Sequence, residues 1–467
     1  MAYSLRGQHP RLRVSTTPKD ALIGCLGATS VVAASLFALK ESVPAVALAL
    51  ALFGTMGAAL ASLRGPAVFR LFIAVYCCSV LATVALYFCY LGRYGAPYYV
   101  GGSDDLAYET SAAAVAERLG ALEYGQIRGN VVPEAHNSVG YVYLVSLLYR
   151  TASAVGGFHT LVPRLLNSLV LGWIAVLTYE LSRDEGLSPR FAGAAALYVG
   201  LAPVMLYAAA HTFRDIVTSF LTLFALHAWR RRRDDRRRGR FVGWICTILI
   251  AALLTQLRLY QAYIPLAVAL TADFASALWP PRSTIPSLLR LAMPVVLCLA
   301  LLVAFRGEIA GLATRLSTQV GTYSSYRVGL SDGLSAYVFR ARPPLSFVLR
   351  ALYALVSPIP ILSTEPERLF LSAGTVLQFS FLPFLGLGLL RAVRDPSRWY
   401  LLVAFLLLFA GFALVSFTWR HLTQVIPVAA VLAATGYPGT RRRALGLSLL
   451  MGWMGIALIG LYAVAKV

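Results

Sequence analysis

The feature that most constrains this chain is a series of apolar stretches that are long enough to cross a lipid bilayer. A transmembrane α-helix needs about 20 predominantly apolar residues. Stretches of this kind occupy residues 21–40, 44–63, 68–92, 163–182, 191–210, 214–230, 241–257, 261–279, 287–305, 371–391, 398–417, 422–437 and 443–464. Because spanning helices satisfy their backbone polar groups internally, the sequence predicts an all-α, polytopic integral membrane protein.

The composition agrees with this fold class. Hydrophobic residues make up 58% of the chain and charged residues only 13%, whereas soluble domains are about 25% charged. Lysine and arginine number 41 against 20 acidic residues, which gives a net charge of +21. In a membrane protein such an excess marks the cytoplasmic loops. We therefore expect the lipid bilayer as a partner and no nucleic acid.

The arginines also predict which loops face the cytoplasm. The arginine-rich segment 230–240, the run Arg441–Arg443 and the basic N-terminus are expected inside. Two further apolar stretches, 138–155 and 345–362, would reverse this assignment if they crossed the membrane. We therefore expect both of them to lie along the outer face.

The resulting prediction is a single transmembrane domain over residues 1–467 with about 13 spanning helices. The N-terminus lies inside and the C-terminus outside. Two long loops, 93–162 and 306–370, lie on the outer face, where most charges outside the cytoplasmic loops then gather. A charge at a helix end is costly unless it reaches the interface or serves a function.

The first outer loop carries an acidic pair, Asp104 and Asp105, after a Gly-Gly-Ser turn and before a helical pattern. Acidic residues at a helix start stabilise it through capping and the helix dipole, which is one interpretation. The other is a general base at the outer membrane surface. Such a carboxylate can also help to bind Mg²⁺ or Mn²⁺ beside a phosphate, and the sequence does not decide whether it does.

Basic and aromatic side chains are expected on the same face, near predicted helix ends. They are His211 and Arg214 next to Asp215, Arg258 with Tyr260, and Arg420 with His421. The guanidinium fork of arginine matches two phosphate oxygens. Each arginine alone is explained by reaching the interface, but together they predict a site for an anionic ligand.

Other segments carry weaker signals. Glu134–Asn137 has no second ligand at helical spacing, so no metal site is predicted there. The polar and aromatic segment 322–327 and the basic segment 340–344 are interpreted as ordinary loops. The sequence contains no P-loop and no nucleophile-elbow or zinc-protease motif, which argues against an ATP-driven pump and a soluble-type hydrolase.

These features, in their order along the chain, resemble the GT-C superfamily of polyprenyl-phosphate-sugar-dependent glycosyltransferases, which includes protein mannosyltransferases and lipid A aminoarabinose transferases. The resemblance covers mainly residues 68–230. It depends on the acidic pair, Gly156-Gly157, Pro163–Leu169 opening a spanning helix, a basic cytoplasmic turn, and Arg214-Asp215. Three predicted spanning stretches precede the acidic loop here, where better-known members have one.

The resemblance implies an inverting membrane glycosyltransferase with its active site on the outer face of a bacterial plasma membrane. The donor would be a polyprenyl-phosphate-linked sugar, and the acceptor a lipid-linked glycan, a lipid or a protein. Asp104 or Asp105 would be the base and Asp215 the second acid. Two alternatives remain open: an O-antigen-type polysaccharide polymerase or ligase, and a transporter or flippase for lipid-linked sugars. Transporters place charge near the bilayer midplane and show repeated halves, and neither feature is evident.

Overall fold

All the regular secondary structure in the described part of the chain is helical. The computed structural model describes residues 44–98, 104–118, 138–233, 237–278, 345–356, 366–416, 419–437 and 446–457, together with residues 338 and 341. Its longer helices are α2 (Pro44–Ser62), α3 (Pro66–Tyr94), α4 (Asp104–Ala116), α6 (Val139–Ser153), α7 (Leu161–Asp184), α8 (Pro189–Leu201), α9 (Pro203–Ala209), α10 (Asp215–Arg233), α11 (Arg237–Leu257), α12 (Tyr263–Leu278), α16 (Leu345–Val356), α17 (Pro366–Arg394), α18 (Trp399–Ala410) and α19 (Leu422–Gly436). Short helical turns are η4 (Leu259–Ala262), η5 (Pro396–Arg398), η6 (Gly411–Ser416) and η7 (Trp419–His421).

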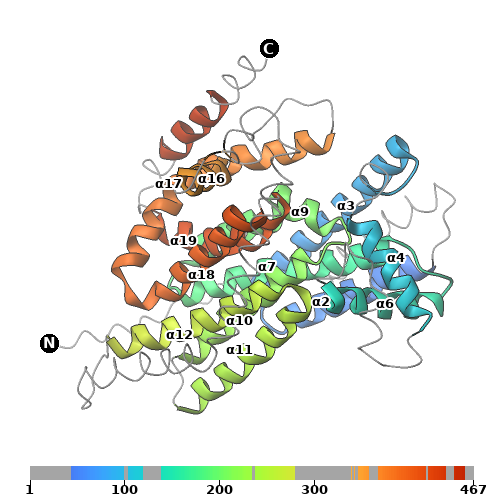
Figure 1. Ribbon diagram of the computed structural model, residues 1–467, viewed down its shortest axis with the longest axis horizontal. Coiled ribbons are helices and arrows are strands. Elements are labelled where there is room, and N and C mark those ends of the chain that lie inside the picture. Colours follow the sequence, from blue (N-terminus) through green and yellow to red (C-terminus); the bar gives the residue numbers. More distant parts are fainter. Residues whose placement is uncertain are drawn as a thin grey trace.

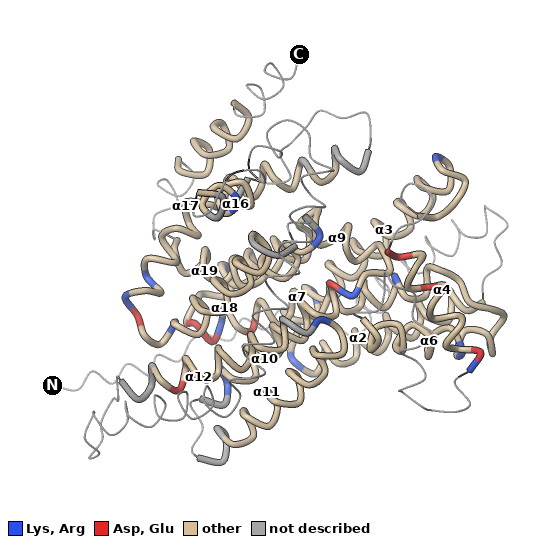
Figure 2. The backbone as a smooth tube through the Cα atoms, in the orientation of Figure 1, with Lys and Arg blue, Asp and Glu red and all other residues tan. Residues whose placement is uncertain are grey.

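Several of these helices are long and apolar enough to cross a membrane. The described residues contain 5 such helices, or 6 if α8 and α9 form one bent span. The five are α2, α3, α7, Ala373–Arg394 of α17, and Pro396–Ala413. Figure 2 shows that most of the described tube carries no Lys, Arg, Asp or Glu. The prediction of a multi-pass membrane protein is therefore supported, whereas the predicted stretches 21–40 and 287–305 lie outside the described residues.

Helix α7 is the centre of the bundle (Figure 1). It is the most deeply buried of the candidate spans, and α2, α3, α8 and α10 pack against it. Small residues allow this close packing. A side chain at Gly172 would place its Cβ 2.8 Å from the ring of Phe72 on α3. Glycine at such positions lets two helix backbones approach each other.

Within the described residues, which leave out 357–362, the two stretches expected not to cross the membrane form short helices. α6 has 15 residues and α16 has 12, and neither is among the candidate spans. A spanning helix needs about 20 residues. Figure 1 shows α6 beside α4, and the two helices are in contact.

One predicted span is broken in the structure. The stretch 191–210 was expected to be a single helix, but α8 ends at Leu201 and α9 starts at Pro203 with a bend of 52°. Proline lacks the backbone N–H that a continuous helix needs, and it disfavours the helical conformation of the residue before it. The bend leads the chain into the buried turn 210–214, which packs against the start of α7 and precedes α10.

Charged residues cluster at the C-terminal end of α7. Glu185, just after the helix, accepts hydrogen bonds from Arg230 Nε at 2.9 Å, Arg398 Nε at 3.2 Å and Tyr400 Oη at 2.7 Å. Glu180 lies 2.7 Å from Arg64 Nη1 and 3.0 Å from His227 Nε2. These contacts join α7 to α10, to α18 and to the turn between α2 and α3, so the polar ends of the helices are fixed to one another.

Candidate active site

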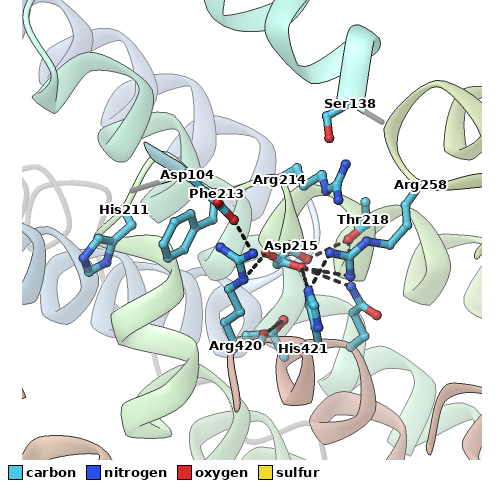
Figure 3. Close-up of polar contacts among 12 residues, drawn as sticks. Asp104, Ser138, His211, Phe213, Arg214, Asp215, Thr218, Arg258, Arg420 and His421 are labelled. Carbon is cyan, nitrogen blue, oxygen red and sulfur yellow. Dashed lines mark hydrogen bonds and ion pairs between the residues drawn. The ribbon is translucent and has the colours of Figure 1, made fainter. Parts of the chain in front are cut away.

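Asp215, the first residue of α10, is the centre of the candidate site (Figure 3). Its side chain is only 2% exposed, and its Oδ1 lies 3.1 Å from Arg258 Nη1. His421 Nε2 approaches Oδ1 to 3.5 Å, Arg420 Nε approaches Oδ2 to 3.9 Å, and Gln424 Nε2 donates to Oδ1 at 3.4 Å. Residues from α10, the end of α11, η7 and α19 therefore converge on one buried carboxylate.

Arg258 also contacts His421. Arg258 Nη2 and His421 Nε2 are 2.6 Å apart. A guanidinium can only donate hydrogen bonds, so Nε2 is the acceptor. The same Nε2 atom lies 3.5 Å from Asp215 Oδ1, so His421 contacts both members of the Asp215–Arg258 pair.

Arg420 connects Asp215 to the acidic pair. Its Nη2 forms an ion pair with Asp104 Oδ2, and its guanidinium lies 4.9 Å from the centre of the Phe213 ring. Burial works to lower the pKa of Arg420, but the carboxylates of Asp215 and Asp104 outweigh it and raise the pKa above its usual value. The side chain of Asp104 is 36% exposed. Asp104 is therefore the carboxylate of this cluster that a ligand can reach.

Asp105 has a different environment from its neighbour. Its side chain is fully buried, and Arg164 Nη2 lies 3.5 Å from its Oδ2. Burial raises the pKa of the Asp105 carboxyl above its usual value, and the positive charge of Arg164 opposes this. Arg164 also donates to the carbonyl of Pro97 at 2.9 Å. Adjacent positions of a helix point in different directions, so the two acids separate into an accessible one and a buried one.

A buried acid that the sequence analysis missed lies further along α4. Glu109 is 5% exposed and accepts hydrogen bonds from the hydroxyl groups of Tyr98, Thr160 and Thr212, each at 2.5 Å. A sequence signal existed, because Asp105 and Glu109 are four residues apart and so share one face of a helix. Arg164 and Gln424 were also missed.

The remaining predicted site residues lie at the edge of this cluster or apart from it. Arg214 Nη1 donates to the carbonyl of Leu257 at 3.0 Å. His211 is buried, its Nδ1 lies 2.8 Å from the carbonyl oxygen of Tyr207, and its ring stacks on Phe213. Burial, together with the charge of Arg164, lowers the pKa of His211 to about 3. His211 is therefore neutral and lies away from Asp215 (Figure 3).

The structure thus brings together five of the predicted residues, namely Asp104, Asp215, Arg258, Arg420 and His421. The side chain of Tyr260, the segment Glu134–Asn137, the segment 322–327 and the arginines of 340–344 lie outside the described residues. Within the described ranges, no group of three or more His, Cys, Asp or Glu residues could hold a metal ion. No family model, curated protein or solved structure matches the chain.

Proposed function

We propose that the chain is an integral membrane glycosyltransferase of the GT-C type, which moves a sugar from a polyprenyl-phosphate donor to a hydroxyl group on the non-cytoplasmic face of a bacterial plasma membrane. The acceptor is a lipid-linked glycan, a lipid or a protein. The observation that carries this proposal is the accessible carboxylate of Asp104 against Arg420, beside the buried pair of Asp215 and Arg258. An acid for proton removal and arginines for a phosphate thus occupy one site.

In the proposed reaction Asp104 is the general base. It takes the proton of the acceptor hydroxyl while the hydroxyl oxygen attacks the anomeric carbon of the sugar. The bond between that carbon and the phosphate oxygen breaks, and its electron pair leaves with the polyprenyl phosphate. This single displacement inverts the configuration of the anomeric carbon.

Arg420 and Arg258 are assigned to the phosphate, where negative charge develops as the bond breaks. Asp215 is assigned to holding these arginines, because its carboxylate is 2% exposed and is already occupied by Arg258. A phosphate that binds Arg420 competes with Asp104 for the same guanidinium. Donor binding would then release the Asp104 carboxylate for its role as base.

A second candidate is an O-antigen-type polymerase or ligase, which uses a pyrophosphate-linked oligosaccharide. The two arginines at one site favour it, since a pyrophosphate carries more charge than a monophosphate. The choice of donor separates the two enzymes. A flippase for lipid-linked sugars would form no bond with either donor.

The test is a transfer assay with the full-length protein in lipid nanodiscs. Polyprenyl-phosphate sugars and pyrophosphate-linked oligosaccharides are supplied in parallel with acceptors, and products are identified by mass spectrometry. We expect transfer from a monophosphate donor. Transfer only from pyrophosphate donors would support the polymerase or ligase, and no product from any donor would contradict both enzymes.

The role of Asp104 is tested by Asp104→Asn. General-base assistance contributes about 10²–10⁴-fold in rate, so the variant should lose transfer by about that factor with an unchanged unfolding temperature. Glu117→Gln is the matched control, because Glu117 is an exposed acid just after the same helix. An Asp104→Asn variant with the wild-type rate would rule out this mechanism.

A further inference from the structure

Glu109 occupies a position in α4 from which it can control Asp104. It lies five residues after Asp104 in the same helix, which is about 7.5 Å along the axis at 1.5 Å per residue. Asp104 is partly exposed, whereas Glu109 is buried at 5% exposure. The helix therefore carries an accessible acid at its start and a buried one a turn and a half further on.

The carboxylate of Glu109 joins three segments that are distant in sequence. Its Oε2 accepts from Tyr98, in the segment that follows α3, and its Oε1 accepts from both Thr160, just before α7, and Thr212, between α9 and α10. Burial and the charge of Glu109 raise the pKa of Tyr98 above its usual value, so the phenol keeps the proton that it donates. Hydrogen bonds to an ionised group are about twice as strong as neutral ones.

One of these contacts reaches the other half of the candidate site. Thr212 lies three residues before Asp215, in the turn that leads into α10. Asp104 and Asp215 are themselves joined through Arg420. The start of α4 and the turn before α10 are thus connected twice, once through Arg420 at the site and once through Glu109.

We propose that Glu109 is a positioning residue that sets the start of α4 against the turn before α10, and so holds Asp104 in place relative to Asp215 and Arg420. The effect on transfer rests on the proposed function, whereas the effect on the geometry does not. Packing against α6 and the ion pair of Asp105 with Arg164 also hold α4 in place. Among the contacts described above, the carboxylate of Glu109 is the one that accepts a hydrogen bond from the turn before α10, through Thr212.

Loss of this restraint should act on the rate of the reaction. A displacement of about 1 Å at a reacting group can cost about 10²-fold in rate. Donor binding depends on Arg258 and Arg420, which do not contact Glu109 in the hydrogen bonds and ion pairs described above. We therefore expect kcat to fall about 10²-fold while KM for the donor stays within about twofold.

The experiment uses two variants that interrupt the same contact from opposite sides, Glu109→Gln and Thr212→Val, in the full-length protein in nanodiscs. Thr212→Ser keeps the hydroxyl group and should restore kcat, and Glu117→Gln is the exposed control on the same segment. The probe is polyprenyl-phosphate mannose, with kcat and KM measured separately. Amide hydrogen exchange over 104–116 and 210–216 is measured on the same samples.

Faster exchange at both segments in Glu109→Gln and Thr212→Val, but not in Thr212→Ser or Glu117→Gln, is the expected result. Unchanged exchange at 210–216 in folded Glu109→Gln would overturn the proposal, as would a loss confined to KM. If the wild-type protein transfers no mannose, the proposal about Glu109 is decided by the exchange data alone, and the transferase proposal is judged separately by its panel of donors.

Discussion

Asp104 and Asp105 show how strongly one position along a helix changes the chemistry of an acid. The side chain of Asp104 is 36% exposed and faces Arg420, whereas that of Asp105 is fully buried against Arg164. The sequence left open which of the two carboxylates would be the base. It did not indicate Arg164, since an arginine at the start of a spanning stretch is ordinarily explained by reaching the interface.

The buried pair of Asp105 and Arg164 predicts a large loss of stability when one partner is removed. Arg164→Met leaves a buried carboxylate without its cation, and breaking such a pair costs about 3–5 kcal/mol. We expect a clear fall in the unfolding temperature, measured in detergent or nanodiscs. The double variant Asp105→Asn with Arg164→Met should lose much less than the sum of the single changes, because neither charge then remains unpaired.

Arg183→Met is the control for this pair, since Arg183 is an exposed arginine at the other end of α7 and donates to the carbonyl of Leu187. Its replacement should change the unfolding temperature little. Additive losses in the double variant would show that Asp105 and Arg164 do not stabilise each other.

At the scale of helices, the sequence predicted several apolar helices at the expected positions and their interruptions poorly. About 13 spanning helices were expected, and the described residues contain 5 that are long and apolar enough. The expected stretches 44–63 and 163–182 correspond to α2 and α7, because a continuous apolar run has no better structure in lipid than a helix. The stretch 191–210 was wrong as a single helix, although Pro203 marks the position of the bend. Packing between distant segments decides which turns such a bend brings together. The contacts of Glu109 depend on this packing, and therefore they were not predicted.

The close packing of α3 on α7 predicts that Gly172 cannot be enlarged without cost. An added Cβ would lie 2.8 Å from the Phe72 ring, so Gly172→Ala should destabilise the protein by about 1–3 kcal/mol through overpacking. Thermal unfolding of the purified protein measures this. Gly193→Ala is the matched control, because nothing lies within 4 Å of a Cβ at that glycine of α8. The double variant Gly172→Ala with Phe72→Leu should recover stability, and no recovery would place the strain elsewhere.

Across the whole molecule, polar clusters lie at both ends of α7 and apolar packing lies between them. Glu109, Asp105 and Arg164 belong to the end where α7 begins, whereas Glu180 and Glu185 belong to the other. The 24 residues of α7 extend about 36 Å at 1.5 Å per residue, which exceeds the apolar thickness of about 30 Å of a bilayer. The helix is therefore long enough for its two ends to reach opposite sides of a membrane.

The arginines at one of these ends predict the orientation of the molecule. Arg230, the first residue of the arginine-rich segment, bonds to Glu185 at 2.9 Å, so this end of α7 should be cytoplasmic by the positive-inside rule. In a variant without the native cysteines, an impermeant thiol reagent added outside should label Ala114→Cys, which is exposed on α4, and not Ser188→Cys, which is exposed after α7. Labelling of both from one side would mean that α7 does not span. The reverse pattern would place Asp104 and Arg420 in the cytoplasm, where a donor presented on the outer leaflet could not reach them.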